Sequence, residues 1–226
     1  MKKNYEMDMC SGPILGKLLT FTIPLIFSGI LQLLFNAADV IVVGRFAGSQ
    51  SLAAVGSTTA LINLMINIFI GLSVGVNVIV ARYYGAKREK DVQDTIHTAM
   101  ALSIVSGLFL IIVGQLLSRP MLELMGTPDD VIDKSTIYMR IIFIGMPANM
   151  IYNFGSAILR AVGDTKRPLY FLTAAGVINV VLNLFFVIMF RMDVAGVALA
   201  TAISQAISAF LVILCLMESE GSLKLH

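Results

Sequence analysis

The sequence predicts an all-α integral membrane protein, built as a bundle of six transmembrane helices. Apolar residues make up 58% of its 226 residues and charged residues only 13%, a balance unlike that of soluble domains. The apolar residues also gather in six long runs, each with room for the ~20 residues that cross ~30 Å of hydrocarbon as a helix. Because these runs are continuous and do not alternate with polar residues, they favour helices over membrane strands.

The six predicted helices follow the apolar runs in chain order. The first run is too long for the core of a signal peptide and no cleavage pattern follows it, so we take it as a membrane helix. Pro24 in this helix and Pro147 in the fourth are candidate kinks. Gly71 and Gly75 in the second helix have the GxxxG spacing that favours close packing. The predicted ranges are 15–43, 53–80, 93–117, 135–158, 168–190 and 194–217.

The predicted six-helix lobe covers residues 1–217, and a linker follows it. One loop inside the lobe has a recognisable turn sequence. The sequence GDTKRP at 163–168 is typical of a turn, because its glycine ends one helix and its proline begins the next. The tail, residues 218–226, has the polar composition of a linker.

Lysine and arginine residues in the short connections predict the orientation. Eleven of the 16 basic residues fall in the amino terminus, the loops after the second and fourth helices and the tail. We therefore expect a multi-pass protein of the plasma membrane with both termini in the cytoplasm. Since topology explains these basic residues, they do not indicate binding of nucleic acid.

The few polar residues inside the predicted helices recur at helical spacing, so each set lies on one helix face. Interhelical hydrogen bonds worth ~0.6 kcal/mol each would account for many of them, including Asn63, Asn67, Ser204 and Ser208. The sets that could line a cavity or a site are Gln32, Asn36 and Asp39, then Asn149 and Asn153, then Asn179 and Asn183, and finally Thr201.

Asp39 is the exception, because a carboxylate at membrane depth costs ~2.5–3.5 kcal/mol. The nearest basic residues, Arg45 and Arg140, lie toward the outer helix ends. Counting ~1.5 Å per residue places Asp39 ~9 Å below the outer end of its helix, and Asn183 and Thr201 ~12 Å below theirs. These residues would share a layer, with Asn179 one turn deeper.

This layer predicts a small oxygen-rich site with one carboxylate. Removal from water disfavours the charged form of a carboxyl group, so a proton could load the site. Amide and hydroxyl oxygens beside a carboxylate also suit a hard cation, and Na⁺ could bind Asp39, Asn179, Asn183 and Thr201. Gln32, Asn36, Asn149 and Asn153 would line the cavity or surround the ion. No cofactor other than this H⁺ or Na⁺ is expected.

Six stretches resemble the multidrug and toxic compound extrusion (MATE) family of secondary transporters, and together they cover nearly the whole chain. They are IPLIFSGILQLLFNAADVIVVGRFAG (23–48), LAAVG (52–56), GLSVGVNVIVARYYGAKR (71–88), NFGSAILRAVGDTKRPL (153–169), INVVLNLFFV (178–187) and AGVALATAISQ (195–205).

The resemblance implies the amino-terminal lobe of a two-lobe, twelve-helix antiporter that exports lipophilic or cationic compounds in exchange for H⁺ or Na⁺. It assigns ion coupling to Asp39 and matches Asn179 and Thr201 to family positions. Many members have an aspartate where this chain has Asn183, so Asp39 would be the sole titrating group. The tail would begin the linker to an absent carboxy-terminal lobe, and that lobe or a second copy of the chain would complete the transporter.

Two other functions fit the same helices. One is a lipid-linked oligosaccharide flippase of the same wider superfamily, which the lack of basic residues at mid-membrane depth disfavours. The other is a fragment or assembly module that transports nothing. An enzyme is not expected, because Asp39 has no second acid or nucleophile beside it. The expected contacts are therefore membrane lipid and small lipophilic or cationic substrates.

Overall fold

The computed structural model describes residues 14–219 and 223–225, and this part of the chain is helical with short turns. The amino-terminal lysines Lys2 and Lys3, and residues 220–222 and 226 of the predicted linker, lie outside the described residues. The elements are α1 (Ile14–Val42), η1 (Val43–Ala47), α2 (Ser49–Gly85), α3 (Glu89–Leu124), α4 (Asp129–Ile144), α5 (Met146–Ala161), α6 (Lys166–Leu184), η2 (Phe185–Met189) and α7 (Asp193–Glu218).

The predicted all-α membrane bundle is confirmed. Five helical segments of the described chain are long and apolar enough to cross a membrane, and α4 and α5 together supply a sixth. The helices α2 and α3 are longer than predicted, with 37 and 36 residues. Their extra turns carry the basic and acidic residues that border the apolar runs, so they extend the helices beyond the hydrocarbon layer.

The fourth span differs from the single helix expected over 135–158. It is broken at Gly145, where α4 and α5 meet at 48°. Pro147 has no amide hydrogen, so the carbonyl of Phe143 loses its helical partner there. At this break α3 comes very close, because a Cβ atom on Gly107 would lie 2.3 Å from Cα of Pro147. By contrast, α1 continues through Pro24 without a break.

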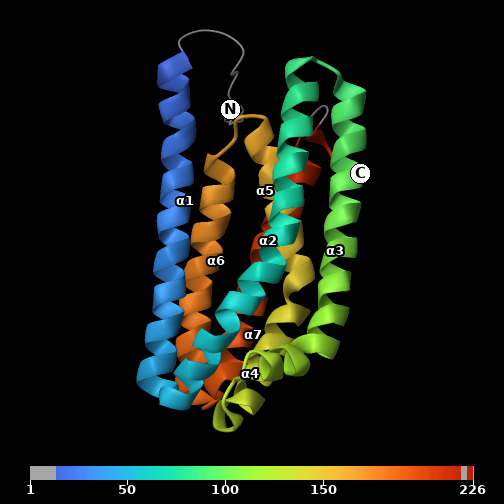
Figure 1. Cartoon of the computed structure of the whole chain (residues 1–226). Coiled ribbons are helices and arrows are strands. Elements are labelled where there is room, and N and C mark those ends of the chain that lie inside the picture. The colour runs from blue at the N-terminus through green and yellow to red at the C-terminus, as the bar shows by residue number, and fades with distance from the viewer. Residues whose placement is uncertain (1–13, 220–222, 226) are drawn as a thin grey trace.

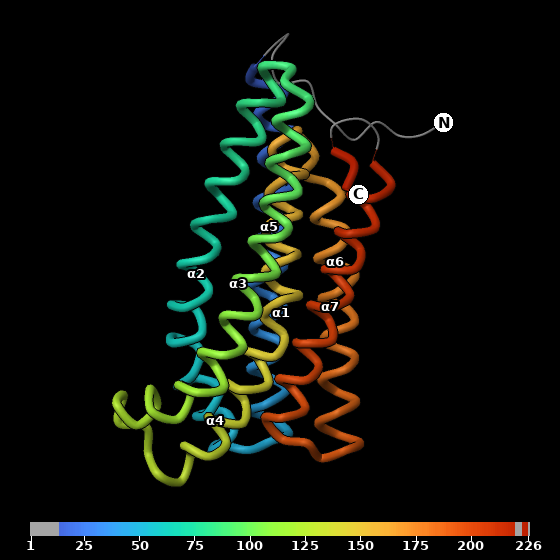
Figure 2. Tube along the Cα trace, turned by 90° about the vertical axis from the view of Figure 1, so that its right-hand side faces the viewer, coloured from blue at the N-terminus to red at the C-terminus, as the bar shows by residue number. Residues whose placement is uncertain are grey.

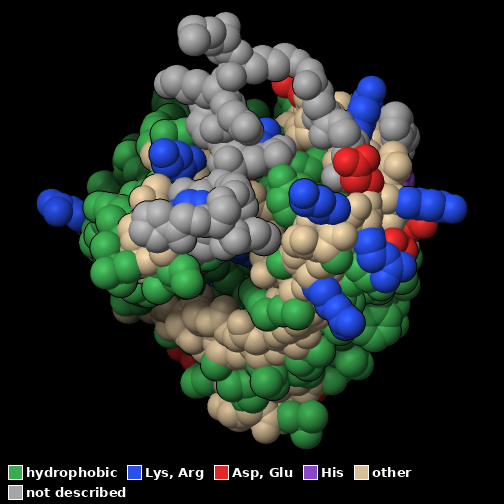
Figure 3. Space-filling model, turned by 90° about the horizontal axis from the view of Figure 1, so that it is seen from above, with side chains coloured by type: hydrophobic (Ala, Val, Ile, Leu, Met, Phe, Trp, Pro, Cys, Tyr) green, Lys and Arg blue, Asp and Glu red, His purple; other side chains and the backbone are tan. Residues whose placement is uncertain are grey.

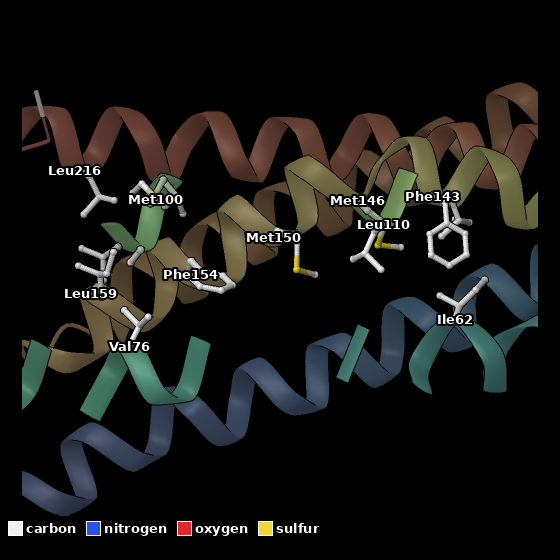
Figure 4. Packing of buried hydrophobic residues seen from close by; sticks show 14 of the residues in the cluster. Ile62, Val76, Met100, Leu110, Phe143, Met146, Met150, Phe154, Leu159 and Leu216 are labelled. Carbon is white, nitrogen blue, oxygen red and sulfur yellow. The ribbon is translucent and has the colours of Figure 1, made fainter. Parts of the chain in front are cut away.

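The helix α5 forms the centre of the main hydrophobic core. It packs against α2, α3 and α7, with α4 below it at the broken span (Figures 1 and 2). Figure 4 shows side chains of α5 alternating with those of its neighbours along this core. The α5 residues Met146, Met150, Phe154 and Leu159 are fully buried. A smaller cluster of valines joins the ends of η1, α2, α4, η2 and α7 at the opposite end from the α2–α3 turn.

The helix α1 lies at the edge of the bundle, and α6 is its neighbour along most of its length (Figure 1). The contact is close because Gly176 of α6 leaves room for the ring of Phe35, which a Cβ atom on Gly176 would approach to 1.9 Å. Most other large side chains of α1 are exposed on the described chain, as expected for a helix that faces lipid or a partner.

The expected role of Gly71 and Gly75 in close helix packing is wrong for this structure. A Cβ atom on either glycine would meet no atom of the described chain within 4 Å. The GxxxG face of α2 therefore points away from the other described helices. The glycines at close contacts lack that spacing; they include Gly107, Gly114, Gly155 and Gly176.

Basic residues gather at one end of the bundle. Figure 3 looks onto this end, where lysine and arginine side chains surround the apolar body. It contains the α2–α3 and α5–α6 turns and the described start and end of the chain (Figure 1). The described basic residues near this end are Lys17, Arg82, Lys87, Arg88, Lys90, Arg160, Lys166, Arg167 and Lys224.

Candidate functional site

A carboxylate in the membrane-spanning region is paired with an amide. The side chain of Asp39 in α1 is partly buried, and its Oδ1 accepts a hydrogen bond from Nδ2 of the fully buried Asn183 in α6. Among the described residues no basic group forms an ion pair with Asp39. Arg45 and Arg140 are both exposed. An amide therefore offsets the cost of this carboxylate in place of a cation.

The pair belongs to a network of polar side chains on α6 and α7. Nδ2 of Asn183 also donates to Oδ1 of Asn179 over 3.2 Å. Nδ2 of Asn179 in turn donates to Oγ1 of Thr201 over 3.3 Å and to Oγ of Ser204 over 3.4 Å. Each amide thus holds its neighbour in one orientation, and the network connects Asp39 to α7 through two asparagines.

The close contact of α1 with α6 brings these groups together. Asp39 follows Phe35 by four residues, so both lie on the face of α1 that packs on α6. Asn179 and Asn183 follow Gly176 by three and seven residues, which places them on the corresponding face of α6. Because the ring of Phe35 sits directly over Gly176, the helices are near enough for Asp39 to reach Asn183.

Two π-helical turns lie beside the site, at the end of the bundle opposite the α2–α3 turn (Figure 1). η1 follows directly on α1 and η2 on α6, and the two turns contact one another. Val43 of η1 and Val187 of η2 are buried in the same apolar cluster. This cluster lies between the polar network and that end of the bundle. Such wide turns inside α-helices often accompany functional sites.

One polar atom of the site has no partner. Oδ1 of Asn183 is buried and accepts no hydrogen bond from the described residues. Since nearly all buried polar atoms in folded proteins are paired, this oxygen is an available acceptor beside the Asp39 carboxylate. A proton shared with the carboxylate or a small hard cation would each use such an acceptor.

The structure brings together four of the eight residues singled out from the sequence, namely Asp39, Asn179, Asn183 and Thr201. The layer count placed Thr201 level with Asp39, but its hydroxyl meets Asn179 instead. Ser204, for which we expected an interhelical hydrogen bond, forms one with Asn179 and so belongs to the network. Its position three residues after Thr201, on the same helix face, was the signal that could have identified it.

The other four residues lie outside the network. Gln32 and Asn36 are exposed on α1 and form no hydrogen bond with the described residues. Asn153 donates to Oδ1 of Asn149 over 2.9 Å, and both are partly buried on α5.

Comparisons with known proteins agree with this architecture. The MatE family model matches residues 24–185. A probable multidrug resistance protein of Bacillus subtilis, YoeA, is 35% identical over 198 residues, which cover 86% of this chain and 42% of that protein. A protein described as an FAD transporter, from Shewanella oneidensis, is 27% identical and is covered to 45% of its length. The chain thus spans slightly less than half the length of these relatives.

Solved structures give the same match. An outward-facing MATE transporter of the MOP superfamily superposes with a TM-score of 0.87 at 25% identity, over 93% of this chain and 47% of that one. A MATE structure in the bent conformation superposes with a TM-score of 0.84 at 26% identity, over 89% of this chain and 45% of that one.

Proposed function

Because the chain belongs to the MatE family of membrane transporters, we propose that it forms one half of a secondary active antiporter. This antiporter exports lipophilic or cationic compounds in exchange for H⁺ or Na⁺. The observation that carries the proposal is the Asp39–Asn183 pair. A carboxylate held at membrane depth without a basic partner is costly. Binding of an exchangeable cation would offset this cost.

The hydrogen-bond network supports a switch with two arrangements. With Asp39 charged, both asparagines turn N–H groups toward the acceptors described above. After protonation the Asp39 hydroxyl requires an acceptor, and rotation of the Asn183 amide supplies Oδ1. Asn179 would then rotate as well, so that Thr201 and Ser204 donate to its oxygen. A bound Na⁺ would require the same rotation, because it binds amide oxygens and not N–H groups.

This switch acts on the attachment of α1. Since α6 is the main neighbour of α1, a change in the Asp39–Asn183 contact alters the free energy that holds α1 against the bundle. Loading the site can therefore favour a different packing of α1. Coupling between ion binding and transport requires such an element.

The proposal includes orientation and completion of the transporter. The end that carries most of the basic residues faces the cytoplasm, and the membrane is the plasma membrane. The exposed apolar surface of α1 faces lipid and a second lobe, which the second half of a longer chain or another copy of this one would provide. Substrates pass between the two lobes.

Binding of a fluorescent lipophilic cation to the purified chain, measured across pH and Na⁺ concentration, tests the proposal. The native protein should show a pH- or Na⁺-dependent transition in affinity that Asp39→Asn lacks. Asp193→Asn, at an exposed outer carboxylate, is the matched control and should retain the transition. A transition that persists in Asp39→Asn would refute coupling at this residue.

A further inference from the structure

A second polar face runs along α5 toward the basic end of the bundle. Tyr152, Ser156 and Arg160 are spaced by four residues, so they form one row on the helix. Pro147, which packs on Gly107 of α3, lies on the opposite side of α5. The row therefore points away from α3, and its Tyr152 hydroxyl donates to the carbonyl of Pro168 at the start of α6 over 3.2 Å.

Arg160 is a partly buried cation without a counter-ion. No carboxylate of the described chain lies within 4 Å of it. The other partly buried basic residues that the structure describes, Lys17, Lys134 and Arg167, all have interaction partners. The remaining described lysines and arginines are exposed. Since removing a charge from water is costly unless it is paired, Arg160 lacks a partner that its environment favours.

Ser156 provides an independent indication one helical turn away. Its side chain is fully buried, and its Oγ forms no hydrogen bond with the described residues. Serines inside helices commonly donate to the carbonyl four residues earlier, as Ser208 does to Ser204. Ser156 does not use this option, and its hydroxyl lies beside that of Tyr152 one turn earlier, so it can donate to Tyr152 or to a ligand. A cation and an O–H donor in one row are the groups that an oxyanion requires.

We propose that Arg160 and Ser156 form an anion-binding site at the inner end of α5, which takes the phosphate or carboxylate group of an amphiphile. The planar guanidinium of Arg160 can contact two oxygens of such a group, and Ser156 donates to one of them. The apolar part of the ligand contacts the neighbouring apolar side chains. The anion is supplied either by a lipid headgroup of the inner leaflet or by a free amphiphilic compound.

This site is separate from the Asp39 network. Arg160 lies in the last turn of α5, near the end of the bundle with the α5–α6 turn, whereas Asp39 is close to η1 at the opposite end (Figure 1). Anion binding at Arg160 goes beyond the proposed antiport and does not depend on it.

Calorimetric titration of the full chain in phosphatidylcholine nanodiscs with dodecyl phosphate tests the site, with dodecanol as the uncharged reference. The native protein should bind dodecyl phosphate more tightly than dodecanol. Arg160→Gln should weaken binding about tenfold or more, as expected for loss of a charged hydrogen-bond donor. Ser156→Ala should weaken it by a smaller factor, and Arg160→Lys should fall between Arg160→Gln and the native protein.

Two variants serve as controls. Arg140→Gln removes an exposed arginine at the other end of the bundle and should bind as the native protein does. Asp193→Asn removes an exposed carboxylate at that same end and should also leave binding unchanged. Thermal unfolding of each variant establishes that it is folded before its affinity is compared.

The proposal is overturned if Arg160→Gln, folded, binds dodecyl phosphate as tightly as the native chain, or if the native chain does not distinguish dodecyl phosphate from dodecanol. Repeating the titration in nanodiscs that contain phosphatidylglycerol identifies the source of the anion. Competition by this lipid supports a headgroup site, and an unchanged affinity supports a site for free amphiphilic anions.

Discussion

Substitution of Gly176 by alanine should weaken the contact between α1 and α6 that lies beside Asp39. The added Cβ would lie 1.9 Å from Cε2 of Phe35, so the ring must move by about 1.5 Å to regain van der Waals distance. Overpacking of this kind costs about 1–3 kcal/mol. The ring is partly exposed and can turn, which favours the lower part of that range, but turning also removes the contact that places Asp39 beside Asn183.

A double-mutant cycle with Phe35→Ala measures this effect. Thermal unfolding of the purified chain should shift downward by about 2–4 °C for each kcal/mol in a protein of this size. The double variant Gly176→Ala/Phe35→Ala should unfold at a higher temperature than the sum of the two single effects predicts, because the methyl group then has room. Gly75→Ala is the matched control, since a Cβ there meets no described atom within 4 Å.

Two results would contradict this reasoning. One is a Gly176→Ala variant as stable as Gly75→Ala, which would mean that α1 adapts without cost. The other is strict additivity in the cycle, which would mean that Gly176 and Phe35 do not interact. Either result would contradict the explanation that the Phe35–Gly176 contact places Asp39 of α1 against α6.

Three further changes test other contacts. Gly107→Ala places a Cβ 2.3 Å from Cα of Pro147, a backbone atom that cannot turn away. The free energy of unfolding should therefore fall by about 1–3 kcal/mol, measured by thermal unfolding in detergent. Asp164→Asn removes the charge of a fully buried side chain that Arg167 contacts. Because Arg167 is only 21% exposed, the free energy of unfolding should fall by about 1–3 kcal/mol, again measured by thermal unfolding. Lys134→Met removes hydrogen bonds of 3.1 and 3.2 Å to α2 and α7; this partly exposed contact should contribute less than about 1 kcal/mol, and high salt should abolish the difference from the native protein.

The sequence was sufficient for properties that depend on short segments. A span is visible because crossing the hydrocarbon requires ~20 apolar residues in succession, and the six runs have this length. Asp39 was identifiable because the cost of a charge at membrane depth is a property of the residue and its flanking apolar run. Proline at position 147 marked the site of the break, since a missing amide hydrogen is also a local property.

Only the tertiary structure decided which of these residues meet. Helical periodicity places Asn36 and Asp39 on neighbouring positions of α1, and Asn149 and Asn153 on one face of α5, but it does not say which neighbour each face contacts. The rotation and lateral position of every helix depend on packing with all the others. In this chain, that packing places Asp39 against Asn183.

The same distinction applies to the glycines and to Arg160. Gly71 and Gly75 have the spacing of a packing motif but face away from the bundle, while Gly176 packs closely without that motif. In the sequence, Arg160 is one of the basic loop residues that predict the orientation of the helices. That it has no counter-ion among the described residues was visible only once the neighbouring helices were in place. The sequence by itself determined which segments enter the membrane, because that depends on transfer from water. The structure decided which polar groups remain unpaired there, because that depends on contacts between residues far apart in the chain.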